Sequence, residues 1–121
     1  MMVIETNLND AALLDPTIYG DERGHFFEGF NRQHLAKVTG YDFCVAQTNH
    51  SRSQRNILRG MHFQVKNVQA KFVWVAAGEI FDAIVDLRRS SSTFGQWYGT
   101  NLSSENRRRI FVPEGFAHGF L

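Results

Sequence analysis

The stretch that decides the fold is KFVWVAAGEIFDAIVDLR, residues 71–88. Its first half is almost continuously apolar and its second half alternates in polarity, a pattern typical of strands. Gly78 separates the halves, so we expect two strands joined by a hairpin turn or a sharp bend. One face of the second strand is predicted to carry the apolar residues Phe81, Ala83, Val85 and Leu87.

Two carboxylates, Asp82 and Asp86, share the other face of that second strand. Their spacing permits paired catalytic carboxylates, but strand carboxylates are more commonly solvated or hydrogen bonded locally. We therefore predict that Asp82 and Asp86 are solvated or locally hydrogen bonded.

Outward from residues 71–88 the chain alternates short strand patterns with polar turns. Asn31 is a plausible N-cap for a short helix over 32–38 that ends near Gly40. The predicted strands cover residues 25–30, 43–48, 56–64, 96–102 and 107–112. Many short strands with one weak helix predict an all-β sandwich or barrel.

Length and composition limit the other possibilities. A chain of 121 residues is expected to form one domain, 1–121. Thirteen Lys and Arg against twelve Asp and Glu give a net charge of +1, so the charge balance does not favour nucleic-acid binding. The longest apolar run, residues 72–77, is far too short to span a bilayer, and no secretory signal is visible. The lone Cys44 is consistent with the cytoplasm and is predicted to be a small core residue.

The C-terminal end interrupts a strand pattern. The sequence stops at Leu121 without a closing turn or a polar tail. An open barrel edge at this point would be prone to aggregation. We therefore expect the barrel to be incomplete at its C-terminus.

Two segments concentrate residues that suit chemistry. The first is Arg59-Gly-Met-His-Phe-Gln64, followed by Lys71, and the second is Pro113-Glu-Gly-Phe-Ala-His118. Alternate residues of a strand share a face, so His62 and Gln64 point the same way. The second segment resembles the Pro-x-Gly-x-x-His piece of cupin barrels, and the first lies where cupins carry His-x-His.

The resemblance to cupins implies a jelly-roll barrel and raises the question of a metal. Metal cupins bind a transition metal through the two histidines of the first segment, an acidic residue and the histidine of the second. Here Gln64 replaces one histidine and Lys71 stands in place of the acid. A lysine cation repels a divalent metal, and two histidines alone make a poor site. We predict no metal and no cofactor.

A more specific resemblance covers the chain from Tyr19 to its last residue. Seven strings, in order and almost without gaps, closely resemble the dTDP-4-dehydrorhamnose 3,5-epimerases, of whose chain they cover roughly the first two thirds. The strings are GDERG (20–24), FEGFN (27–31), QTNHS (47–51), LRGMHFQ (58–64), GEIFD (78–82), VDLRRSS (85–91) and VPEGFAHGF (112–120). The resemblance implies epimerisation at C3 and C5 of dTDP-4-dehydro-6-deoxyglucose on the route to dTDP-rhamnose.

The resemblance also implies a mechanism. Protons at C3 and C5 flank a keto group, so removing one forms an enolate, and returning it to the other face inverts the centre. It assigns the general base to His62, and imidazole suits this task near neutral pH. It assigns Lys71 to stabilising the negative charge that develops on O4.

Five further residues are implied to contact the diphosphate, the sugar or the nucleotide. His118 would line the same pocket as His62. Arg59 would bind the diphosphate, because a guanidinium can grip phosphate oxygens in a bidentate manner. Arg23 would reach the diphosphate from a partner subunit, and Gln47 and Asn49 would contact nucleotide or sugar.

Three N-terminal residues match the thymine site of the family. Tyr19, Phe26 and Glu28 would hold thymine by stacking and hydrogen bonding. The resemblance implies that Phe26 and Glu28 are donated across a homodimer formed through the N-terminal strand.

The family's catalytic acid does not match a residue of this chain. The resemblance places that tyrosine, and the carboxylate that orients the catalytic histidine, after Leu121, and Tyr19, Tyr41 and Tyr98 do not align with it. We therefore expect proton exchange without inversion from these 121 residues. A catalytically silent nucleotide-sugar binder is one alternative. A metal cupin, such as a dioxygenase or a phosphomannose-type isomerase, is another, and stoichiometric Fe, Mn or Zn would favour it.

Overall fold

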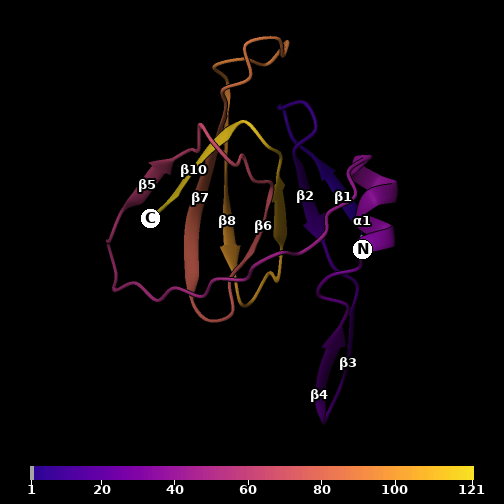
Figure 1. Cartoon of the computed structure of the whole chain (residues 1–121). Coiled ribbons are helices and arrows are strands. Elements are labelled where there is room, and N and C mark those ends of the chain that lie inside the picture. Colours follow the sequence, from indigo (N-terminus) through magenta and orange to yellow (C-terminus); the bar gives the residue numbers. More distant parts are fainter. Residues whose placement is uncertain (1) are drawn as a thin grey trace.

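The computed structural model describes residues 2–121 as two four-stranded antiparallel sheets, a hairpin and one helix (Figure 1). In spatial order the first sheet contains β1 (Met2–Glu5), β2 (Ala12–Asp15), β9 (Arg109–Val112) and β6 (Lys71–Trp74). The second contains β5 (Arg59–His62), β10 (Phe116–Phe120), β7 (Glu79–Asp86) and β8 (Trp97–Ser103). The hairpin pairs β3 (Ile18–Asp21) with β4 (Gly24–Phe27), and α1 spans Arg32–Thr39.

The main core lies between the two sheets. Strand β9 alternates, so that Ile110 and Val112 belong to this core while Phe111 packs on the opposite face of its sheet. From the second sheet, Ile84 and Leu102 complete the core with no exposed surface. Because alternate residues of β7 and β9 face this space, the two inner faces define where a site can lie.

The predicted helix is confirmed, and its ends follow from its caps. The Asn31 side chain accepts a hydrogen bond from the His34 backbone N–H at 2.9 Å. Gly40 takes a left-handed conformation with φ 75° and donates its N–H to the Ala36 carbonyl at 2.8 Å. Leu35 is buried in a second cluster with Phe111, so α1 covers the outer face of the first sheet.

Residues 71–88 form the two predicted strands, β6 and β7, with Gly78 at φ 87° in the turn between them. The face of β7 that is most deeply buried is the one that carries the two carboxylates, and not the face with Phe81, Ala83, Val85 and Leu87. Asp82, Ile84 and Asp86 have no exposed surface, whereas Phe81 is 43% exposed. The prediction that these carboxylates are solvated or locally hydrogen bonded is therefore wrong for Asp82, whose partner His118 is 36 residues away, and is confirmed for Asp86, whose partners are local.

Two other predictions differ from the structure. Residues 43–48 form no strand and belong to the long irregular connection that crosses the molecule from α1 to β5 (Figure 1). Phe43 nevertheless packs against Phe72 and Phe111, which explains its apolar character. Cys44 is exposed instead of buried. The structure also contains a hairpin of β1 and β2, which the sequence pattern of residues 2–15 did not predict.

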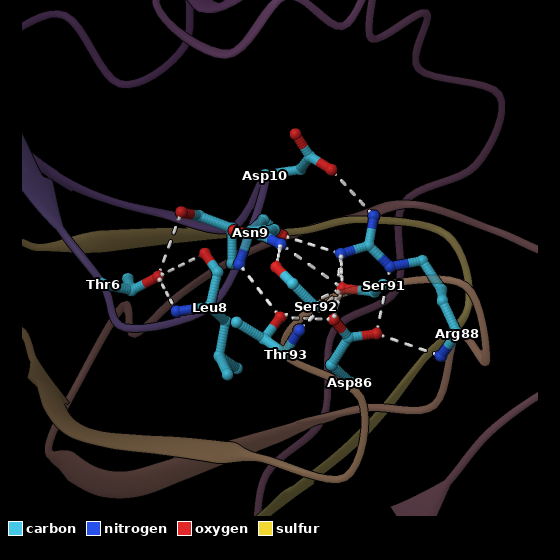
Figure 2. Close-up of polar contacts among 10 residues, drawn as sticks. Thr6, Leu8, Asn9, Asp10, Asp86, Arg88, Ser91, Ser92 and Thr93 are labelled. Carbon is cyan, nitrogen blue, oxygen red and sulfur yellow. Dashed lines mark hydrogen bonds and ion pairs between the residues drawn. The ribbon is translucent and has the colours of Figure 1, made fainter.

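Asp86 is the centre of a polar network at one end of the sheets (Figure 2). Its Oδ2 accepts hydrogen bonds from the hydroxyls of Ser91 at 2.6 Å and Thr93 at 2.7 Å. The Arg88 guanidinium donates to both carboxylate oxygens at 3.0 Å and reaches Asp10 at 2.8 Å. Asp86 is thus hydrogen bonded locally, as predicted, and the network joins the β1–β2 loop to the β7–β8 loop.

Arg109 is an unusual buried cation on the outer face of the first sheet. It is 6% exposed, and its guanidinium lies 5.1 Å from the Phe27 ring centroid and 5.0 Å from that of Trp74. Burial lowers the pKa of this guanidinium. The aromatic rings provide cation–π contacts that offset part of the cost of burying the charge.

Candidate active site

Pairing of β5 with β10 places two histidines side by side. His118 is the Cα partner of His62 in this antiparallel ladder. Directly opposite residues of an antiparallel pair project from the same face, with their Cβ atoms about 5 Å apart. The structure therefore brings together the two histidines that the sequence singled out in separate segments.

Two glycines allow β5 and β10 to approach closely at this point. A Cβ placed on Gly60 would lie 2.7 Å from the Gly119 Cα and 2.7 Å from the His118 carbonyl oxygen. A Cβ on Gly119 would lie 2.9 Å from the Arg59 carbonyl oxygen. These distances are shorter than real Cβ contacts, so the ladder that aligns His62 with His118 requires glycine at both positions.

Gly60→Ala is therefore expected to destabilise the fold and to separate the two histidines. Gly60 has φ 108°, so alanine adds about 1–3 kcal/mol of backbone strain to the steric clash. Gly78→Ala is the matched control, because Gly78 also has positive φ but nothing lies within 4 Å of its Cβ position. Urea denaturation of both variants measures the difference, and equal losses of stability would contradict a role for the close approach.

His118 forms a buried pair with Asp82. Its Nε2 lies 2.7 Å from Asp82 Oδ1, with the Asp82 side chain fully buried and the His118 side chain 11% exposed. Burial raises the pKa of the Asp82 carboxyl, and the His118 hydrogen bond and charge, together with the charge of Lys71, lower it in part. Asp82 Oδ2 is buried and has no hydrogen-bond partner among the described residues.

Lys71 faces this pair from the other sheet. It begins β6 opposite Val112, whose side chain belongs to the core between the sheets, and it is partly buried. Its positive charge helps to lower the pKa of Asp82 without a direct ion pair between the two groups among the described residues. Lys71, Asp82, His118 and His62 therefore form a polar cluster that combines a cation with two imidazoles.

The predicted phosphate-binding residue Arg59 lies at the start of β5, on the same strand as His62. Its side chain is exposed, and its guanidinium donates to Ser53 Oγ at 2.8 Å and to the Arg52 carbonyl oxygen at 3.3 Å. Gln47 and Asn49 lie in the irregular connection before β5, where the Gln47 amide donates to Asn49 Oδ1 at 2.9 Å. All three are accessible, and no hydrogen bond among the described residues joins them to His62.

The residues matched to the thymine site lie apart from this cluster, on the β3–β4 hairpin. Tyr19 and Phe26 are Cα partners in the hairpin and, together with Arg23, line a shallow hollow. Arg23 forms an exposed ion pair with Asp21 at 2.7 Å. Glu28 follows the hairpin and accepts a hydrogen bond from the Asn31 amide at 3.2 Å. A single chain thus does not bring these residues to His62.

Asp82 is a further residue of the site that the sequence motifs did not reveal. The relevant signal is its place in β7, where it pairs with Phe120, two residues after His118 on β10. That register depends on pairing between strands far apart in sequence. Among residues 2–121 no three His, Cys, Asp or Glu side chains gather into a possible metal site, and no helix is long and apolar enough to span a membrane.

Comparison with known proteins agrees with the resemblance. Residues 5–121 match the family model described as dTDP-4-dehydrorhamnose 3,5-epimerase. The enzyme of that name from Salmonella typhimurium is 52% identical over 122 residues, which cover 100% of this chain and 67% of the relative. The chain spans about two thirds of the length of its curated relatives.

Solved structures share the fold. The dTDP-4-dehydrorhamnose 3,5-epimerase of Elizabethkingia anophelis superposes with a TM-score of 0.95 at 43% identity, covering 100% of this chain and 67% of that chain. The dTDP-6-deoxy-D-glucose-3,5-epimerase of Legionella pneumophila, solved with dTDP-4-keto-L-rhamnose, gives 0.93 at 47% identity, covering 98% and 63%. The predicted cupin-type all-β fold is thereby confirmed, and the chain belongs to the dTDP-4-dehydrorhamnose 3,5-epimerase family.

Proposed function

We propose that this chain abstracts protons and binds the nucleotide in the epimerisation of dTDP-4-dehydro-6-deoxyglucose at C3 and C5. The observation that carries the proposal is the cluster of His62, His118 and Lys71, in a chain that belongs to this epimerase family. The Legionella relative binds a dTDP-4-keto sugar, which supports the same class of ligand here. We also propose that it works in the cytoplasm, where the exposed Cys44 thiol stays reduced.

The proposed mechanism assigns one step to each polar group. His62 removes the proton at C3 or C5, because a neutral imidazole is a competent base near pH 7. The C–H electron pair then forms the C=C bond of the enolate, and negative charge moves to the C4 oxygen. Lys71 stabilises that charge, since a fixed cation in a partly desolvated site lowers the energy of a developing oxyanion.

Isotope exchange tests this function directly. The purified chain, incubated with the 4-keto sugar nucleotide in D₂O, is expected to introduce deuterium at C3 or C5. Incubation without the protein measures the background rate. Binding of dTDP without any incorporation above background would contradict the epimerase function and favour a silent nucleotide-sugar binder.

Arg59→Lys is expected to weaken dTDP binding by about tenfold, although it keeps the charge. A guanidinium offers a bidentate fork to the diphosphate, whereas an ammonium acts as a point charge. Calorimetric titration with dTDP in the absence of Mg²⁺ measures the change. Arg55→Lys is the control, since Arg55 lies outside the strings shared with the family. Unchanged affinity of the Arg59 variant would remove Arg59 from the site.

We further propose that the chain forms a homodimer through its β3–β4 hairpin. The hairpin projects away from the two sheets (Figure 1), and Tyr19 and Phe26 are 65% and 72% exposed. A lone two-stranded hairpin is marginally stable in water, so it needs a surface to cover it. A second copy would place Phe26, Arg23 and Glu28 near the partner's site, where the family resemblance requires them.

Sedimentation velocity tests the assembly. The wild-type chain is expected to sediment as a dimer at micromolar concentration, and Phe26→Ser is expected to shift it toward the monomer. Phe94→Ser is the control, because Phe94 is similarly exposed, at 52%, but lies outside the hairpin. A wild-type chain that stays monomeric and still binds dTDP tightly would contradict the proposed dimer.

A further inference from the structure

Two carboxylates on the inner face of β7 are fully buried but are used in different ways. Both oxygens of Asp86 accept hydrogen bonds, from Arg88, Ser91 and Thr93. Asp82 accepts one hydrogen bond, through Oδ1, and its Oδ2 has no partner among the described residues. A carboxylate that is buried for stability has its lone pairs satisfied, as Asp86 does.

The incomplete bonding of Asp82 argues against a purely structural role. Taking a carboxylate out of water costs free energy unless hydrogen bonds and opposite charges compensate for it. Asp82 gains one short bond from His118 and a more distant charge from Lys71. The effect of this arrangement is to hold Nε2 of His118, whose residue pairs with His62 across the β5–β10 ladder.

We propose that Asp82 is a positioning residue that fixes the tautomer and ring orientation of His118 toward the substrate. An ionised carboxylate can only accept, so the bond at 2.7 Å requires the proton of neutral His118 to lie on Nε2. Nδ1 is then the unprotonated nitrogen. The identity of the ligand in front of His118 rests on the proposed function, whereas the tautomer does not.

The selected tautomer has a consequence for recognition. With its lone pair on Nδ1, His118 can accept a hydrogen bond from a hydroxyl of the bound sugar but cannot donate one to the keto oxygen. The Lys71 ammonium is then the donor suited to that oxygen in this cluster. The pair Asp82–His118 therefore favours a sugar that presents a hydroxyl at this point, since a site built around a hydrogen bond rejects analogues that lack it.

Asp82→Asn should invert the tautomer. The asparagine amide must place its NH₂ either toward the position of Oδ2, where no acceptor lies among the described residues, or toward His118 Nε2. The second orientation satisfies the NH₂ only if Nε2 has lost its proton, which moves to Nδ1. In serine proteases, replacing the aspartate behind the catalytic histidine by asparagine produces a wrong tautomer in the same way.

Nitrogen-15 NMR of the histidine side chains tests the proposal on the chain as it exists. Above the imidazole pKa, wild-type His118 is expected to show a protonated Nε2 and an unprotonated Nδ1. In Asp82→Asn the two nitrogen resonances are expected to exchange these ranges. Bound dTDP-sugar is expected to shift the wild-type Nδ1 resonance, and exchange of the C3 or C5 proton should slow by about 10- to 100-fold with dTDP affinity unchanged.

Asp86→Asn is the matched control, because it changes the other buried carboxylate of the same strand without a histidine contact. It is expected to lower stability and to leave the His118 resonances unchanged, whereas Asp82→Asn should keep or raise the urea midpoint. A wild-type His118 with its proton on Nδ1 would overturn the proposal, as would an Asp82→Asn variant that loses more stability than Asp86→Asn. If the tautomer is as stated but no exchange occurs in the wild type, the proposed function fails and the role of Asp82 stands.

Discussion

Replacing His62 by alanine is expected to abolish deuterium incorporation at C3 and C5 of the 4-keto sugar nucleotide. A positioned general base contributes about 10²–10⁴-fold to a proton transfer, so the variant should fall to the background rate. His62 is exposed at the end of β5 and makes no hydrogen bond among the described residues, so its loss should leave the fold intact. Proton NMR of the sugar in D₂O follows the incorporation.

A matched control separates the loss of a base from the loss of any imidazole. His34 lies on α1, away from the β5–β10 ladder, so His34→Ala is expected to exchange at the wild-type rate. Calorimetric titration with dTDP should show that His62→Ala still binds the nucleotide. Retained incorporation in that variant would assign the base to another group, with His118 the first candidate because it stands opposite His62.

The same experiment compares exchange with inversion. Inversion requires a proton donor on the face opposite the base. Of the three tyrosines, Tyr41 donates its hydroxyl to Glu114 at 2.9 Å, Tyr19 lies on the projecting hairpin, and Tyr98 packs against the apolar core between the sheets. We therefore expect the 121-residue chain to exchange protons faster than it forms rhamnose-configured product. Equal rates would show that another residue or a water molecule supplies the proton.

The sequence pattern predicted the secondary-structure elements that are determined by residues within or next to them. The helix predicted over 32–38 follows from a cap at each end, and the bend at Gly78, which carries the chain from β6 in one sheet to β7 in the other, follows from a glycine between two apolar patterns. The strand predicted at 43–48 does not form, because Phe43 is apolar for a different reason. It packs against rings of β6 and β9, a contact between distant segments that periodicity cannot distinguish from a strand.

The site residues also divide into those that sequence motifs predict and those that depend on contacts between distant segments. His62, Lys71 and His118 were identified from motifs, because each lies in or beside a string shared with the family. Asp82 was not, because its contact with His118 depends on the register of β7 against β10. The thymine residues of the hairpin were identified by resemblance, but one chain does not bring them to His62, and the second copy that we propose is not encoded in any local pattern.

Asp86→Ala is expected to have the largest effect on stability, a loss of about 3–5 kcal/mol at pH 7. Breaking a buried ion pair by removing one partner is strongly destabilising, and here the loss of Asp86 takes the acceptor from two hydroxyls and leaves the Arg88 guanidinium with Asp10 as its only carboxylate. Such a loss corresponds to a decrease in Tm of more than about 10 °C for a chain of this size. Asp42→Ala is the control. Asp42 pairs with Arg32 in an exposed bridge, which contributes less than about 1 kcal/mol.

The pH dependence of the same variant gives a second, independent test. Burial raises the pKa of the Asp86 carboxyl, but the hydrogen bonds from Arg88, Ser91 and Thr93 lower it by more than burial raises it. The pKa therefore lies well below its usual range. A carboxylate with a depressed pKa in the folded state stabilises the fold above its unfolded pKa of about 3.9. That contribution is lost as the pH falls through the folded pKa. The difference in unfolding free energy between wild type and Asp86→Ala should therefore be constant from about pH 5 to pH 7 and shrink below about pH 4. A difference that stays constant into strong acid would show that Asp86 contributes through packing and not through its charge.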